Sequence, residues 1–130
     1  MKRDKSVDEW VEKAEGDFET VLDLRSKRRP KQRYIIAFHC QQCVEKYLKA
    51  LLTFHRIHFP KHHDLEELLA LLLDTDPLLA PIRKQLKELT PYAVEFRYPG
   101  DVVTPEEVTE AVKYAKQLRP ILRKRLGLKS

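Results

Sequence analysis

FHCQQCVEKYLKALL, from Phe38 to Leu52, is the stretch that decides the fold of this chain. At about 100° of rotation per residue, its apolar side chains gather on one side of a helix, as in helices that pack on a core. Its polar side chains form two neighbouring stripes, one of His39, Gln42, Lys46 and Lys49 and the other of Gln41 and Glu45. A merely solvated face more often carries Glu, Lys and Arg without amides. We therefore expect this helix to present a surface that binds a polar ligand.

Composition restricts the class of protein. A chain of 130 residues is long enough for one domain with a real core, so we expect a single domain over residues 1–130. The charged fraction of 35% is high and the net charge of +5 is modest. The low number of glycines, three, together with many Leu, Lys, Glu and Arg favours an all-helical protein. The opening MKRDKSVDEW has no apolar stretch after its basic start, and no run approaches the ~18 apolar residues of a membrane span. We expect a cytoplasmic protein that does not enter a membrane.

The first two helices are separated by a proline. A capping box formed by Ser6 and Glu9 predicts the start of the first helix, and Pro30 divides it from the second. The second helix should run from about Lys31 to about Arg56. Its apolar arc covers near half of the circumference, which indicates contact with more than one neighbour, so we place it at the centre of the fold.

The third and fourth helices are predicted by the same kind of signal. Asp64 with Glu67 caps a short leucine-rich helix that continues to Leu73. Pro81 fits the first turn of a long fourth helix, and Pro91, inside its apolar pattern, predicts a kink or a break.

The fifth helix has the clearest start, because Thr104, Pro105 and Glu107 combine a capping hydroxyl, a proline at the first position and a glutamate in the box. No strand pattern is found. We therefore expect an all-α fold, an antiparallel up-and-down bundle of four long helices plus one short helix. If the helices alternate in direction, the basic segments 25–33 and 119–125 lie at the same end and could meet phosphates.

Cys40 and Cys43 form a C-x-x-C string in the middle of the second helix. A redox pair needs its attacking thiol at a helix N-terminus, where the helix dipole lowers the thiol pKa. We interpret both as buried small apolar residues. The alternative is a redox pair or a zinc site completed by His62 and His63, which cysteines on an apolar arc do not easily approach. We expect no metal and no cofactor.

Two further residues have both a structural and a functional interpretation. His63 precedes the Asp64 cap, and its side chain can turn back over the bundle. Arg97 follows the fourth helix, where it can cap carbonyl groups or hold a guanidinium ready for a phosphate.

Four motifs together make the chain resemble the HEPN family, whose name describes a domain of higher eukaryotes and prokaryotes proposed to bind nucleotides. They are Asp17-Phe18, FHCQQCVEKYLKALL, His63-Asp64-Leu65 and Arg97-Tyr98-Pro99. The resemblance covers nearly the whole chain, and the helix string is its most specific part. It implies an antiparallel bundle of four or five helices that usually dimerises. Many prokaryotic members are encoded beside a minimal nucleotidyltransferase, and the pair often acts as toxin and antitoxin.

Some members of this family are ribonucleases that cleave RNA without metal. The resemblance implies that such members carry Arg, four to six residues and then His late in the bundle. No histidine follows Arg97 at any of these distances, which favours the non-catalytic branch. The same string occurs from Arg33 to His39 and from Arg56 to His62 or His63, and in a chain with many arginines and five histidines such matches arise by chance. Arg33 and His39 are not neighbours on one helix face, whereas Arg56 and His63 flank a loop and could converge.

Three hypotheses follow. In the first, a homodimer binds a nucleotide or an RNA phosphate in a cleft lined by Asp17, Gln42, Lys46, Lys49, His63, Arg97 and Tyr98. In the second, the chain is a toxin-like ribonuclease with His63 or His39 as acid or base and Arg97 or Arg56 on the phosphate. In the third, the glutamine and lysine stripe is a seam for a second copy or a partner protein.

Overall fold

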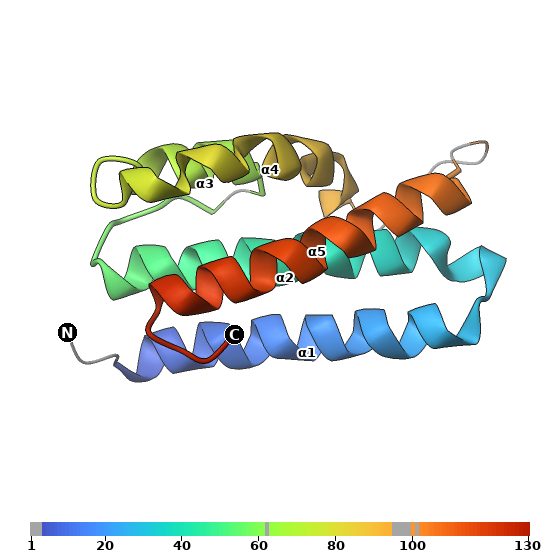
Figure 1. The fold of residues 1–130 in the computed structure, drawn as a ribbon, viewed down its shortest axis with the longest axis horizontal. Coiled ribbons are helices and arrows are strands. Elements are labelled where there is room, and N and C mark those ends of the chain that lie inside the picture. Colours follow the sequence, from blue (N-terminus) through green and yellow to red (C-terminus); the bar gives the residue numbers. More distant parts are fainter. Residues whose placement is uncertain (1–3, 62, 95–99, 101) are drawn as a thin grey trace.

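The computed structural model describes residues 4–61, 63–94, 100 and 102–130, and this part of the chain is all-α (Figure 1). The α-helices are α1 (Lys5–Lys27), α2 (Arg33–Phe54), α3 (Leu65–Leu72), α4 (Arg83–Leu89) and α5 (Pro105–Arg125). Three 3₁₀ segments join them, η1 (Pro30–Gln32), η2 (Pro77–Ile82) and η3 (Thr90–Ala93). The described residues contain no strand, and the predicted all-α class is confirmed.

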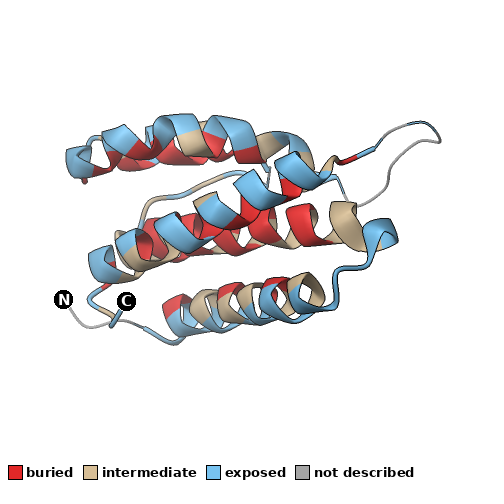
Figure 2. Ribbon diagram, turned by 45° about the vertical axis from the view of Figure 1, so that its right-hand side comes forward, coloured by how far each residue is buried: buried red, intermediate tan, exposed pale blue. Residues whose placement is uncertain are grey.

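Helix α2 lies at the centre, in contact with α1, α3 and α5. Its apolar side carries Val44, Tyr47 and Leu51, all without solvent exposure. Figure 2 shows the buried residues on the inner faces of the helices and the exposed ones on the outer faces. The central position predicted from the broad apolar arc is confirmed.

Three helices are long, and the prediction of four was wrong. Helix α4 has 7 residues, because a proline-containing 3₁₀ segment lies on each side of it. Pro81 belongs to η2 and Pro91 to η3. Proline lacks the N–H that an α-helix needs and clashes with the preceding turn, so the α-helix is confined between the two. The break expected at Pro91 is confirmed.

Side-chain caps set three helix starts. Asp4 caps α1, its Oδ1 accepting a hydrogen bond of 3.1 Å from the Val7 N–H, so Ser6 lies inside the helix and its predicted capping box is wrong. A carboxylate at the cap also complements the positive end of the helix dipole, an advantage the serine hydroxyl lacks. The caps predicted at Asp64 and Thr104 are confirmed, the second as a complete capping box.

After α2 the chain turns back along that helix. The carbonyl of His63 accepts a hydrogen bond from Gln41, and the His63 ring contacts Glu45, both near the middle of α2. The Leu65 N–H donates to the Thr90 hydroxyl, which places the start of α3 beside the end of α4. The chain therefore enters α5 at the end of the bundle where α2 begins.

Helices α2 and α5 consequently run in the same direction, opposite to α1 (Figure 1). Arg25, in the last turns of α1, donates to Thr109 in the first turns of α5, whereas Glu15 pairs with Arg119. The basic segments 25–33 and 119–125 therefore lie at opposite ends, and the expectation that they share one end was wrong. The returning stretch after α2 breaks the simple alternation on which that expectation depended.

Candidate functional site

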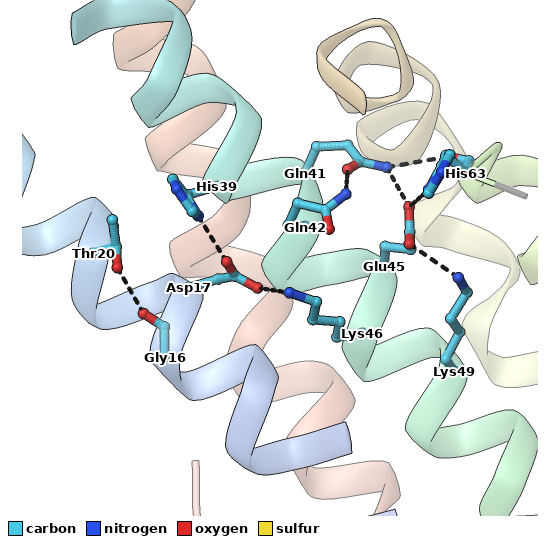
Figure 3. A network of polar contacts seen from close by, with 10 residues as sticks. All are labelled: Gly16, Asp17, Thr20, His39, Gln41, Gln42, Glu45, Lys46, Lys49 and His63. Carbon is cyan, nitrogen blue, oxygen red and sulfur yellow. Dashed lines mark hydrogen bonds and ion pairs between the residues drawn. The ribbon is translucent and has the colours of Figure 1, made fainter. Parts of the chain in front are cut away.

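The polar face of α2 carries two clusters, each built around a buried carboxylate (Figure 3). The Asp17 cluster consists of Asp17, His39 and Lys46. The Glu45 cluster consists of Gln41, Gln42, Glu45, Lys49 and His63.

The Asp17 cluster joins α1 to α2. Asp17 is 7% exposed and shares the inner side of α1 with Ala14 and Val21. Its Oδ1 lies 2.7 Å from Nδ1 of His39, and its Oδ2 accepts a hydrogen bond of 2.6 Å from Nζ of Lys46. His39 and Lys46 are two turns apart on α2 and so share a face. A carboxylate buried at this depth requires such partners, because desolvation penalises an unpaired charge.

The Glu45 cluster joins α2 to the returning chain before α3. Glu45 is 3% exposed, and its Oε1 accepts from Gln41 at 3.0 Å and lies 2.8 Å from Nδ1 of His63. Its Oε2 accepts from Nζ of Lys49 at 3.0 Å. The Gln41 amide also donates to the His63 carbonyl and accepts from Gln42 at 2.8 Å, so each of its polar atoms is bonded.

Lys49 has aromatic neighbours as well as a carboxylate. Its Nζ lies 5.7 Å from the centroid of the Trp10 ring and 6.0 Å from that of Phe59. These distances suit cation–π attraction, which is stronger for a charge withdrawn from water. Lys49 is therefore held among α1, α2 and the returning chain rather than extended into solvent.

The structure divides the predicted stripe in two. Lys46 turns toward α1, whereas Lys49 turns toward Glu45. Of the residues predicted for the site, Asp17, Gln42, Lys46, Lys49 and His63 belong to the two clusters, and Arg97 and Tyr98 lie outside the described residues. The ligand-binding role of all seven stays a prediction.

Two members of the clusters were not predicted as site residues. Gln41 and Glu45 were placed on the neighbouring stripe, yet they anchor the second cluster. The signal that could have identified them is the i, i+4 spacing of Gln41, Glu45 and Lys49, which allows three polar side chains to bond along one helix face. His63 was considered for the site because it precedes the Asp64 cap. Its ring does turn back over the bundle, where it contacts Glu45.

A third polar group ties α1, α2 and α5 together. Glu15 pairs with Arg119 through hydrogen bonds of 2.5 and 2.8 Å and accepts another from the Tyr47 hydroxyl. Arg123 in turn donates to the Tyr47 oxygen at 2.9 Å. The hydrogen bonds from Arg119 hold the pKa of Glu15 below its usual range, although burial acts in the opposite direction. Burial, followed by the Glu15 hydrogen bond, raises the pKa of Tyr47.

The cysteines are structural. Cys40 and Cys43 are both free and without solvent exposure, which confirms their interpretation as buried small residues. Burial raises the pKa of the Cys40 thiol to about 12 and also raises that of Cys43. Such thiols hold almost no thiolate near neutral pH, and the thiolate is the reactive species. Across the described residues, no three side chains of His, Cys, Asp or Glu are grouped so as to hold a metal ion.

The structure does not bring together the second arginine and histidine pair considered for ribonuclease chemistry. Arg56 lies two residues past the end of α2, in the left-handed region at φ 58°, whereas the His63 ring contacts Glu45, nine residues before that end. At about 1.5 Å per residue, Glu45 lies roughly 13 Å along the helix axis from the end of α2.

The sequence matches the model of a known protein family over most of its length. The model of the HEPN domain matches residues 7–125, so the chain belongs to the HEPN domain family and the resemblance based on four motifs is confirmed. Neither a curated protein nor a solved structure matches the chain. Within the described ranges, no helix combines the length and hydropathy needed to cross a bilayer.

Proposed function

We propose that residues 1–130 act as one HEPN-type module that binds the phosphate of a nucleotide or of RNA at the Asp17 and Glu45 clusters. We also propose that it works in the cytoplasm as a homodimer beside a minimal nucleotidyltransferase, in a toxin–antitoxin-like system. The dimer and the partner are inferred from the family alone.

One observation carries the phosphate proposal. Each buried carboxylate is contacted by one lysine and one histidine, His39 and Lys46 on Asp17 and His63 and Lys49 on Glu45. Each carboxylate therefore has two basic side chains around it, and the lysine of each pair keeps N–H donors beyond the one that its carboxylate accepts. A phosphate that approaches the cluster can accept from these donors. The His63 side chain is 62% exposed, so a ligand can reach it without any rearrangement of the core.

The stability of the bundle gives no reason for these groups to be polar. Desolvation of two charges offsets most of their mutual attraction, and apolar side chains of similar volume would stabilise the fold at least as well. The clusters therefore favour a binding role over a purely structural one.

Calorimetry with a panel of nucleotides tests the proposal. Lys46→Gln keeps a donor for Asp17 but removes the charge, and it should weaken binding about tenfold, since a hydrogen bond to a charged group contributes roughly 1.5–3 kcal/mol. Lys84→Gln, at an exposed position on α4, is the matched control and should bind like the wild type. Absence of binding at millimolar nucleotide, with and without magnesium, would contradict the proposal.

A second candidate function is metal-independent RNA cleavage. It is favoured by the 2.7 Å contact between Asp17 and His39, because a carboxylate that orients a histidine is the usual partner of a general base. RNA incubated with the protein in chelator separates the two functions. Cleavage that His39→Asn abolishes would support the enzyme, whereas intact RNA together with nucleotide binding supports the binding module.

Solution scattering tests the third hypothesis, in which the glutamine and lysine stripe of α2 is a seam for a second copy or a partner protein. Solution scattering on Lys46→Gln should show an unchanged oligomeric state if Lys46 serves a ligand. A loss of the dimer without any change in nucleotide binding would favour the seam.

A further inference from the structure

A cationic pocket of about 690 Å³ lies where α1 ends, α2 begins and α5 starts. It is separate from the Asp17 and Glu45 clusters, and its lining shares no residue with them. Its charged lining residues are Arg25, Arg28, Arg29, Arg33 and Lys116. Among the described residues that line it, none carries a carboxylate. Five positive charges around one hollow without a compensating acid create a strong positive potential.

The arginines of the pocket lie on or beside the tight turn between α1 and α2. Arg28 ends α1 in the left-handed region at φ 50°, and Pro30 then starts η1, so the chain reverses tightly between the two helices. Arg25 is held in place by a 2.8 Å hydrogen bond to the Thr109 hydroxyl on α5.

The other cations of the pocket are available to a ligand. Within the part of the chain that the structure describes, Arg28, Arg29, Arg33 and Lys116 form no ion pair. The neighbouring Lys27 differs, because its Nζ lies 3.1 Å from Asp23.

The apolar part of the lining is aliphatic. It consists of Leu22, Ile36 and Val108 together with two prolines, and no aromatic ring is among the described lining residues. Proteins that read single-stranded bases stack them on aromatic side chains. A pocket with cations and no rings therefore suits phosphates and is indifferent to base identity.

The positive surface continues along α5. A second, shallower pocket of about 400 Å³ shares Arg25 and Lys116 with the first and adds Lys113, again without a carboxylate among its described lining. On its far side Lys113 borders a third pocket, whose lining includes Glu106 and Glu110, so the positive surface ends there. We call this continuous surface, made of Arg25, Arg28, Arg29, Arg33, Lys113 and Lys116, the elbow track. Two adjoining hollows provide more cationic surface than the phosphates of one mononucleotide require.

We infer that the elbow track binds the phosphate backbone of a single-stranded nucleic acid without sequence preference. This binding goes beyond the function proposed above, because it uses a different face of the bundle and different residues. It adds to the module a contact for a chain of several nucleotides.

Fluorescence anisotropy with a labelled oligouridine of about twelve nucleotides tests this inference, with the affinity measured at several salt concentrations. For single strands the logarithm of the binding constant falls with the logarithm of salt by about 0.7 for each phosphate contact. The double variant Arg28→Ala/Arg29→Ala should bind more weakly and flatten this slope by about 1.4. The matched control Lys84→Ala/Lys87→Ala removes two exposed charges from α4 and should leave affinity and slope unchanged.

A second variant tests the far end of the track. Lys113→Glu, at an exposed position on α5, should also weaken binding of the oligouridine, and circular dichroism checks that each variant keeps its helices. Equal binding by the arginine variant and the α4 control would overturn the inference. Displacement of the RNA by ATP or tripolyphosphate at equal phosphate concentration would also overturn it, because that result indicates a site for free nucleotides. Binding of oligoglutamate as tight as that of the RNA would overturn it too, because that result indicates a generic basic surface. The double variant Arg28→Ala/Arg29→Ala should still bind a mononucleotide with the affinity of the wild type, because neither arginine belongs to the Asp17 or Glu45 cluster. A failure of the elbow track is therefore distinct from a failure of the nucleotide proposal.

Discussion

Nζ of Lys46 on α2 lies 2.6 Å from Oδ2 of Asp17 on α1, and this contact fixes a buried carboxylate between the two helices. The Asp17 side chain is 8% exposed and the Lys46 side chain 22%. The lysine thus reaches from the helix surface to an acid that water hardly touches. The contact joins the packing of the bundle to the chemistry of its candidate site.

Removal of this lysine should destabilise the fold. Lys46→Ala leaves Asp17 with His39 as its remaining described partner and should lower the free energy of unfolding by about 1–3 kcal/mol. Lys84→Ala, exposed on α4, should stay within about 0.5 kcal/mol of the wild type. Urea denaturation measures both. Equal stabilities for the two variants would show that Asp17 does not depend on Lys46.

Stability should depend on pH through Glu15. Hydrogen bonds from Arg119 lower the pKa of Glu15 in the folded state from its ordinary value of 4.5. A carboxyl whose folded pKa lies below its unfolded pKa stabilises the fold fully above the unfolded value, and this contribution is lost as pH falls through the folded value. The wild type should therefore exceed Glu15→Gln in Tm at neutral pH, with a gap that closes below about pH 4.5. A gap that stays constant down to strongly acidic pH would contradict this account of Glu15.

The Cys40 thiol should be inert in the native protein. Burial raises its pKa to about 12, so both the thiolate fraction and access to the sulfur are low. Iodoacetamide at mildly alkaline pH should modify Cys40 and Cys43 only in proportion to unfolding by urea, with the adduct followed by mass spectrometry. Rapid modification of either thiol without denaturant would contradict the prediction and would show that α2 unfolds locally around the two cysteines.

The helix starts were the most predictable part of the fold. The caps at Asp64 and Thr104 depend on local contacts within a few residues, which a sequence displays directly. Asp4 was missed because Ser6 offered a competing box two residues later. The length of α4 was overestimated because the apolar spacing continues through Pro91, although the backbone beyond Leu89 becomes 3₁₀.

The direction of α5 and the pairing of the clusters could not be predicted in this way. Both depend on the chain that returns along α2 to bring His63 beside Glu45, a path that no local pattern encodes. Periodicity does place His39 and Lys46 on one face, but their acid comes from another helix and becomes visible only once α1 is packed. Local chemistry thus predicts the elements, and tertiary packing decides which charges meet.

Nucleotide titration followed through the histidine ring resonances by NMR tests the central claim most directly. The account predicts that AMP or ATP shifts the rings of His39 and His63, which contact the two buried carboxylates. The rings of His55 and His58, which belong to neither cluster, should stay in place and serve as internal controls. Resonances of His39 and His63 that do not move at saturating nucleotide, or that move no more than those of His55 and His58, would contradict the claim that these clusters bind phosphate.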